Sequence, residues 1–184
     1  MRVEKLRQAY DVDIQTVHFP LHPETPADGQ SLEQLFAGRD VDLDAMYQNM
    51  KARMDKEGLP YGKRTHTYNS RLAQELGKWA DTHDGGDAIH MKLYKAYFVE
   101  GRNIGDPDIL VEIAESVCLS GAAAREVIET RSFETAVDAD WEKSRQYGIT
   151  SVPTYVADAK GVVGAQPYGV LERLLDAAGA QKRN

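Results

Sequence analysis

Residues 148–167 read GITSVPTYVADAKGVVGAQP, and Pro153 stands where a strand should begin. Proline has no N–H to donate to a sheet, so it occurs at edge strands, at the first residue of a strand or at bulges. The residues after Pro153 are rich in β-branched side chains, and Asp158 to Gly161 are turn formers. The stretch predicts a β-hairpin whose first strand follows the proline.

The local sequence leaves two conformations open for the Val152–Pro153 bond. A trans proline at the first residue of an edge strand loses no ladder hydrogen bond. A cis proline would instead keep the strand edge open, but only about 5–6% of X–Pro bonds are cis. The hairpin alone therefore favours trans.

The rest of the chain has mostly helical periodicity. Residues 1–10 indicate the end of a helix, and residues 14–19 indicate a strand that Pro20 ends. About six helices follow between residues 39 and 148, and an amphipathic helix follows the hairpin. Because a lone hairpin cannot bury its faces, the separated strands should meet in one sheet. These patterns predict an α/β fold with a large helical insertion.

Composition excludes several classes of protein. The 184 residues are 42% hydrophobic and carry a formal net charge of −7, which argues against binding to nucleic acid or to an anionic membrane. No stretch approaches the roughly 20 apolar residues of a membrane span. The first residues are charged and helical in pattern, unlike a signal peptide. We expect a soluble, cytoplasmic protein.

The chain has one cysteine, Cys118. It can form neither an internal disulfide nor a Cys-x-x-Cys pair. Cys118 continues the apolar side of a helical pattern with Ile113, Ala114 and Val117. This pattern predicts a small buried hydrophobic residue and not a reactive thiol.

Two further patterns, a methionine stripe and a histidine pair, bear on function. Met46, Met50 and Met54 form a helical stripe that predicts core packing, with an adaptable apolar binding surface as the alternative. His18 and His22 are four residues apart, a metal-ligand spacing on a helix, but Pro20 interrupts the segment. We expect no metal site.

Several segments together resemble one known family. They are HFPLHPETP (18–26), NSRLAQEL (69–76), LYKAYFVEGRNIGDPDIL (93–110), GITSVPTYV (148–156) and GAQP (164–167). Their order and spacing are similar to the FrnE-like branch of the DsbA family, whose relatives include 2-hydroxychromene-2-carboxylate isomerases and kappa-class glutathione transferases. The resemblance implies a thioredoxin-like fold, with residues 1–38 and 149–184 in the thioredoxin-like domain and residues 39–148 in an inserted helical domain.

The resemblance also implies site residues. It implies a cis bond before Pro153, with Val152, Pro153 and Thr154 presenting backbone groups to an extended thiol or peptide substrate. Asn69 and Ser70 match an Asn-Thr or Asn-Ser pair that faces the active cleft in glutathione-using relatives. The alternative is that Asn69 or Ser70 caps the helix that follows. Gln166 corresponds to a loop that holds a γ-glutamyl group. The relatives carry an acidic residue or serine there, which weakens the expectation of glutathione as a cofactor.

The sequence departs from the family at its beginning. Family members start with a strand and then carry a Cys-Pro-x-Cys motif, or a serine in the isomerases, at the N-terminus of the first long helix. This sequence starts in what corresponds to the end of that helix, so we expect a fold without the first strand and the start of the first helix. No catalytic residue is assigned. The strand 14–19 should then pair with the hairpin or leave edges for a partner, such as a homodimer.

Three functions remain open from the sequence. The first is a thiol–disulfide oxidoreductase of the DsbA family that is inactive as given, because the redox motif is absent. The second is a glutathione-dependent isomerase or transferase. The third is a non-catalytic module that binds an extended peptide in the groove beside Pro153.

Overall fold

A computed structural model describes residues 2–183 of the chain. The chain forms two compact units. The terminal unit comprises the residues up to Leu21 and those from Asp140 onward, and the helical unit comprises His22–Ala139.

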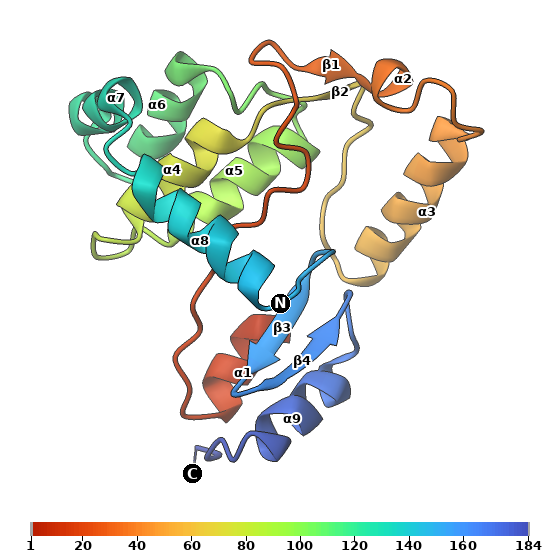
Figure 1. The fold of residues 1–184 in the computed structure, drawn as a ribbon, viewed down its shortest axis with the longest axis vertical. Helices are drawn as coiled ribbons and strands as arrows, with labels where there is room; N and C mark the ends of the chain where they lie inside the picture. The colour runs from red at the N-terminus through yellow and green to blue at the C-terminus, as the bar shows by residue number, and fades with distance from the viewer. Residues whose placement is uncertain (1, 184) are drawn as a thin grey trace. The chain divides into compact units, whose positions relative to one another are not determined.

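In the terminal unit, helices α1 (Arg2–Ala9) and α9 (Tyr168–Ala177) pack on a β-hairpin. Figure 1 shows both helices beside the hairpin. The buried residues of this core are Leu6, Tyr10 and Leu171, and Tyr155 and Val162 of the hairpin pack against them. Because side chains alternate along a strand, Tyr155 and Val162 face these helices while their neighbours face the opposite side.

The hairpin consists of β3 (Thr154–Ala157) and β4 (Lys160–Val163) in antiparallel register. The pairs run from Ala157 opposite Lys160 to Thr154 opposite Val163, with a two-residue connection in which Asp158 has a φ of 55°. The predicted hairpin is therefore confirmed. The Val152–Pro153 peptide bond is cis, the conformation that the family resemblance implies.

The predicted strand at residues 14–19 is wrong. Residues 11–20 have an irregular backbone, and within residues 2–183 the two sheets are the hairpin and a short pair elsewhere. The side chains alternate in burial only from residue 11 to residue 15, where Val12 and Ile14 pack against the α1–α9 core. A strand also requires a hydrogen-bonded ladder, and this segment does not pair with the hairpin. The direct pairing that would have formed one sheet is absent from the described residues.

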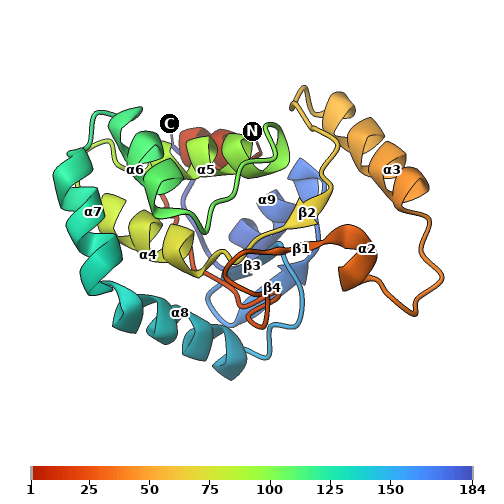
Figure 2. The same ribbon diagram turned by 90° about the horizontal axis from the view of Figure 1, so that it is seen from above.

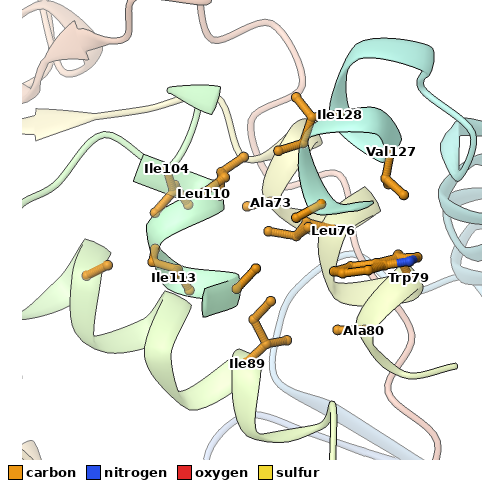
Figure 3. Close-up of a cluster of buried hydrophobic side chains, with 13 residues drawn as sticks. Ala73, Leu76, Trp79, Ala80, Ile89, Ile104, Leu110, Ile113, Val127 and Ile128 are labelled. Atoms are coloured by element: carbon orange, nitrogen blue, oxygen red, sulfur yellow. The ribbon is translucent and has the colours of Figure 1, made fainter. Parts of the chain in front are cut away.

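The helical unit is built around four helices, α4 (Arg71–Ala80), α5 (Ala88–Phe98), α6 (Pro107–Glu115) and α7 (Gly121–Thr130). They surround a cluster of 13 buried side chains that includes Leu76, Ile89 and Leu110 (Figure 3). Helix α6 begins as its sequence predicts, since the Asp106 side chain accepts from the Asp108 N–H and Pro107 follows the cap.

Other elements of this unit are less embedded. Helix α3 (Leu43–Lys56) has no buried residue, and Figures 1 and 2 show it apart from α4–α7. The short elements β1 (Gln30–Ser31), α2 (Leu32–Leu35) and β2 (His66–Thr67) were not predicted. Two-residue strands are too short to show periodicity in a sequence.

Helix α8 (Glu134–Gln146) crosses the boundary between the two units. The domain boundaries predicted from the sequence fall after residues 38 and 148, whereas the compact units divide at Leu21 and Ala139. The reason lies in local bonds. Asn69 donates to the Thr25 carbonyl (2.7 Å), which ties that segment to the helical unit, and the Asp140 carboxylate accepts from the His18 N–H (3.0 Å) in the terminal unit.

Two predictions of burial are wrong. Met46 and Met50 are 38% and 39% exposed and Met54 is only half-buried, because none of the described residues covers this side of α3 closely enough to bury it. Cys118 is exposed because α6 ends at Glu115, and Cys118 lies beyond it with a left-handed φ of 63°. The helical pattern in the sequence therefore continues past the helix itself.

Candidate functional site

Among residues 2–183, β3 pairs with β4 along one edge, and no strand pairs with its other edge. Pro153, Tyr155 and Ala157 lie in the hydrogen-bonded positions of the hairpin, as the 2.7 Å bond from the Gly164 N–H to the Pro153 carbonyl indicates. In an antiparallel pair the residues between these positions direct their N–H and C=O away from the partner strand. Thr154 and Val156 therefore present backbone groups on the side of β3 away from β4.

A groove of about 470 Å³ lies beside this edge, entirely within the terminal unit. We call it the β3 groove. It is lined by alternate residues of the segment before Pro20, by the end of α8 with the residues after it, and by alternate residues of β3 and its turn. These are Asp13, Gln15, Val17, Phe19, Lys143, Ser144, Tyr147, Ile149, Thr154, Val156 and Asp158. The volume is in the range of about 300–1,000 Å³ that is usual for ligand sites.

The groove combines apolar and charged groups. Tyr147 is 54% and Val156 is 44% exposed, so apolar area faces solvent here. Lys143 donates to the Gln15 side chain (3.3 Å). Asp13 and Asp158 are exposed, and neither forms a hydrogen bond or an ion pair through its side chain within residues 2–183. The two carboxylates are therefore available to a positively charged ligand.

Side-chain contacts of Tyr10 stabilise the core on which the hairpin packs. The Tyr10 hydroxyl donates to Asp176 Oδ1 (2.8 Å), which links the end of α1 to α9, and the Lys182 ammonium lies 5.4 Å from the Tyr10 ring centroid. Burial and the bond to Asp176 raise the pKa of Tyr10. The phenol therefore stays protonated and donating across the neutral range.

The structure brings four of the five predicted site residues together at one end of the hairpin. Val152 is 46% exposed, Pro153 is exposed, and the Thr154 hydroxyl donates to the Ser151 carbonyl (2.7 Å). Gln166 donates through its side chain to the carbonyl of Val163, which is opposite Thr154 in the register.

The fifth residue, Asn69, belongs to the helical unit. Its Oδ1 accepts from the Arg71 N–H (2.9 Å) at the start of α4, and its Nδ2 donates to the Thr25 carbonyl. Both ends of the Asn69 amide are thus engaged, which matches the capping alternative from the sequence.

The sequence analysis did not identify Asp13, Lys143, Tyr147 or Asp158 as site residues. The alternation in residues 13–19 is visible in the sequence, but only the fold places it beside β3 and α8. No group of three or more His, Cys, Asp or Glu side chains in the described part of the chain could hold a metal ion. No helix among the described residues is long and apolar enough to cross a membrane.

A hairpin with α1 and α9 on one face, joined through α8 to a separate helical unit, has the plan of a thioredoxin-like domain with a helical insertion. The model of one family, the DSBA-like thioredoxin domain, matches residues 1–176. The chain belongs to this family.

Two similar proteins support the assignment. The uncharacterized protein YwbO of Bacillus subtilis (strain 168) is 28% identical over 180 residues, which cover 94% of this chain and 85% of YwbO. The crystal structure of the probable DsbA oxidoreductase SCO1869 from Streptomyces coelicolor is 29% identical. The two structures superimpose with a TM-score of 0.87, and the alignment covers 97% of this chain and 82% of the SCO1869 chain.

Proposed function

We propose that this DsbA-family chain binds extended thiol or peptide substrates at the Ser151–Thr154 end of the hairpin, without carrying out disulfide exchange itself. Membership of the DSBA-like family supports the substrate class. The observation that carries the proposal has two parts. Val152 and Pro153 form an exposed surface on the substrate side, and the chain has a single cysteine.

The chemistry of thiol–disulfide exchange explains why we expect this chain not to carry out the exchange itself. Oxidising a dithiol substrate requires a disulfide in the enzyme, which two thiols must form and regenerate through a mixed disulfide. Cys118 has no second cysteine with which to form an internal disulfide.

An activity assay tests the absence of exchange. We expect insulin reduction with dithiothreitol, and oxidation of a dithiol peptide, to proceed at the rate of the buffer alone. Cys118→Ala should give the same rate. Activity that is clear in the natural chain and lost in Cys118→Ala would refute the proposal.

A binding assay tests the surface. We expect a fluorescent peptide with an alkylated cysteine to bind saturably, and Val152→Asp to weaken binding about tenfold or more. Val41→Asp is the matched control, because Val41 is an exposed valine (36%) that belongs to the helical unit. Equal loss in both variants would count against the Val152 surface.

Glutathione titration separates the isomerase or transferase alternative from this proposal. The Gln166 amide, at the position where relatives hold the γ-glutamyl group, donates to the chain's own Val163 carbonyl. We therefore expect no saturable response to glutathione at millimolar concentration. A saturable response that Gln166→Ala abolishes would favour the alternative.

A further inference from the structure

We propose that the chain associates with a second copy of itself through helix α3, which pairs antiparallel with α3 of the second copy about a twofold axis. This inference goes beyond the proposed function, because it concerns self-association and involves neither a thiol nor the hairpin. The homodimer expected from the sequence rested on strand edges, whereas this contact lies between helices.

Helix α3 rests on the helical unit through one of its sides. None of its 14 residues is buried. Leu43, Tyr47 and Met54 share a side and are half-buried. The Tyr47 ring stacks on Tyr61, with 6.1 Å between the ring centroids. This contact orients α3 and leaves the adjoining side exposed to solvent.

Exposed residues at spacings of three or four run along that adjoining side. Such spacings keep residues on one side of a helix. Asp42 is the N-cap of α3, Glu57 is its C-cap, and Arg39 lies just before the helix. We call the set the α3 stripe, and its members are Arg39, Asp42, Met46, Met50, Arg53 and Glu57. It has methionines at its centre and charged residues at both ends.

The charges of the α3 stripe are complementary to those of a second copy. A twofold axis beside Gln48 places Asp42 opposite Arg53 of the second copy. The same axis places Arg39 opposite Glu57 of the second copy. The two pairs agree on the position of the axis to within one residue, which is roughly 1.5 Å along a helix. An antiparallel helix pair therefore brings opposite charges together at each of its ends.

The same axis brings the methionines together. Met46 comes opposite Met50 of the second copy, so the apolar side chains meet between the charged ends. Met46 and Met50 are 38% and 39% exposed, and pairing removes this apolar area from water. Methionine is unbranched and adapts its shape to such contacts. Because twofold dimers use the same patch on both copies, every contact occurs twice.

The charged groups of the stripe are available for these pairs. The side chains of Arg39 and Arg53 form no hydrogen bond or ion pair with any of residues 2–183. Asp42 Oδ1 accepts from the Ala45 N–H (2.9 Å), which fixes the carboxylate at the start of the helix. A carboxylate offers about four acceptor sites, so Asp42 can accept from an arginine as well.

The formal net charge of −7 on each copy opposes association at long range. At about 0.15 M ionic strength, exposed charges more than about 8 Å apart are largely screened. The charges in direct contact then decide, and in the α3 stripe they are balanced. A single pair of helices is a small interface, so we expect a dissociation constant in the micromolar range or weaker.

Sedimentation velocity of the full chain at about 0.15 M ionic strength tests for the dimer. We expect the mean mass to rise from 20.5 kDa toward twice that value as the concentration of the chain increases from about 5 µM to about 1 mM. A mean mass that stays at 20.5 kDa over this range would show that the proposal is wrong.

Two variants with the same change in net charge test the stripe. Arg53→Gln and Gln48→Glu each make the net charge more negative by one. Gln48 is exposed and lies two residues from both Met46 and Met50, about 200° around the helix. We expect Arg53→Gln to raise the dissociation constant about threefold to tenfold, because the dimer loses two ion pairs, and Gln48→Glu to change it less than about twofold. Equal effects would overturn the proposal.

A third variant tests the apolar centre of the stripe. Met46→Gln keeps the length of the side chain but makes it polar. We expect it to raise the dissociation constant about tenfold or more, because it removes apolar contact from both halves of the dimer. An unchanged dissociation constant would contradict the proposed contact.

A charge swap tests the register of the two helices. Arg39→Glu and Glu57→Arg should each weaken the dimer, because each places like charges opposite one another. The double variant restores opposite charges and should return the dissociation constant to within about twofold of that of the natural chain. If the two single effects simply add in the double variant, the antiparallel register is wrong.

Circular dichroism checks that each variant remains folded. If Met46→Gln unfolds, the comparison of Arg53→Gln with Gln48→Glu decides. A dimer that none of these variants weakens forms through another surface and would overturn the proposal. Because no variant alters the hairpin, loss of binding to the alkylated-cysteine peptide with self-association intact would refute only the proposed function.

Discussion

Glu75 shows how a single residue shapes the helical unit. Its side chain is 1% exposed, accepts from Arg71 Nε (2.7 Å) and accepts from Arg131 at both carboxylate oxygens (2.6 and 2.7 Å). The Arg71 guanidinium continues to Asp138 (2.7 Å). A carboxylate at this depth is stable only because both of its oxygens are paired. The arrangement joins α4 to residues at the end of α7 and within α8.

Replacing Glu75 by glutamine should destabilise the chain. Glu75→Gln leaves two arginines without their buried counter-charge, and we expect a loss of about 3 kcal/mol in the free energy of unfolding. Urea denaturation measures it. Glu142→Gln, which breaks an exposed pair with Arg145, should cost about 0.5 kcal/mol or less. Equal effects would mean that the buried network contributes nothing.

The same carboxylate should make stability depend on pH. Burial acts to raise the pKa of Glu75, but the hydrogen bonds from Arg131 and Arg71 outweigh it and lower the pKa below its ordinary value of 4.5. A lowered pKa in the folded state stabilises the fold above pH 4.5, and this contribution is lost as the pH falls through the folded value. We expect unfolding free energy to fall more steeply for the natural chain than for Glu75→Gln between about pH 5 and about pH 3. Parallel curves would contradict this.

At the scale of elements, one glycine sets how a connection packs. Gly62 precedes β2 and donates its N–H to the Phe98 carbonyl at the end of α5 (2.8 Å). A Cβ at this position would lie 2.2 Å from the Val99 carbonyl oxygen. Because the obstacle is backbone, no side-chain rotation can relieve it.

Gly62→Ala should therefore separate this connection from α5. We expect a loss of about 2 kcal/mol or more in the free energy of unfolding, measured in urea. Gly169→Ala is the control, since the nearest atom to its added Cβ is the flexible Arg173 guanidinium at 3.9 Å. Within α9 that change should stabilise by up to about 1 kcal/mol. If both variants changed the free energy of unfolding in the same direction, the packing argument for Gly62 would be refuted.

At the scale of the whole molecule, the two units have cores of different size. The helical unit buries a cluster of 13 side chains, whereas the α1–α9 cluster of the terminal unit buries three. Apolar burial is the main favourable term in folding, so the smaller core should open more readily. We expect amides of α9 and the hairpin to exchange with deuterium faster than those of α4 and α6. Mass spectrometry with peptide resolution measures this, and uniform protection would contradict it.

Much of this arrangement could be predicted from local signals. Asp106 and Pro107 predicted the start of α6, the turn at Asp158 predicted the hairpin, and Asn69 was recognised as a capping candidate for α4. These signals work because a cap, a turn and a strand alternation depend on residues within a few positions of one another.

Other features could not be predicted from local sequence signals. Cys118 and Met46 follow helical periodicity, yet Cys118 lies past the end of its helix and Met46 lies on a helix that buries none of its residues. Periodicity states which residues share a face, but not whether another element covers that face.

The amino-acid sequence by itself determined the class of the chain, the helices other than the short α2, the hairpin and the presence of a single cysteine. Only the tertiary structure decided that residues 13–19 lie beside β3 without forming a strand, with Asp13 and Asp158 lining one groove. The physical reason is the distance along the sequence between the residues that interact. Caps and turns are set by neighbours in the chain, whereas this groove is lined by residues more than a hundred positions apart, which the packing of α1, α8 and α9 brings together.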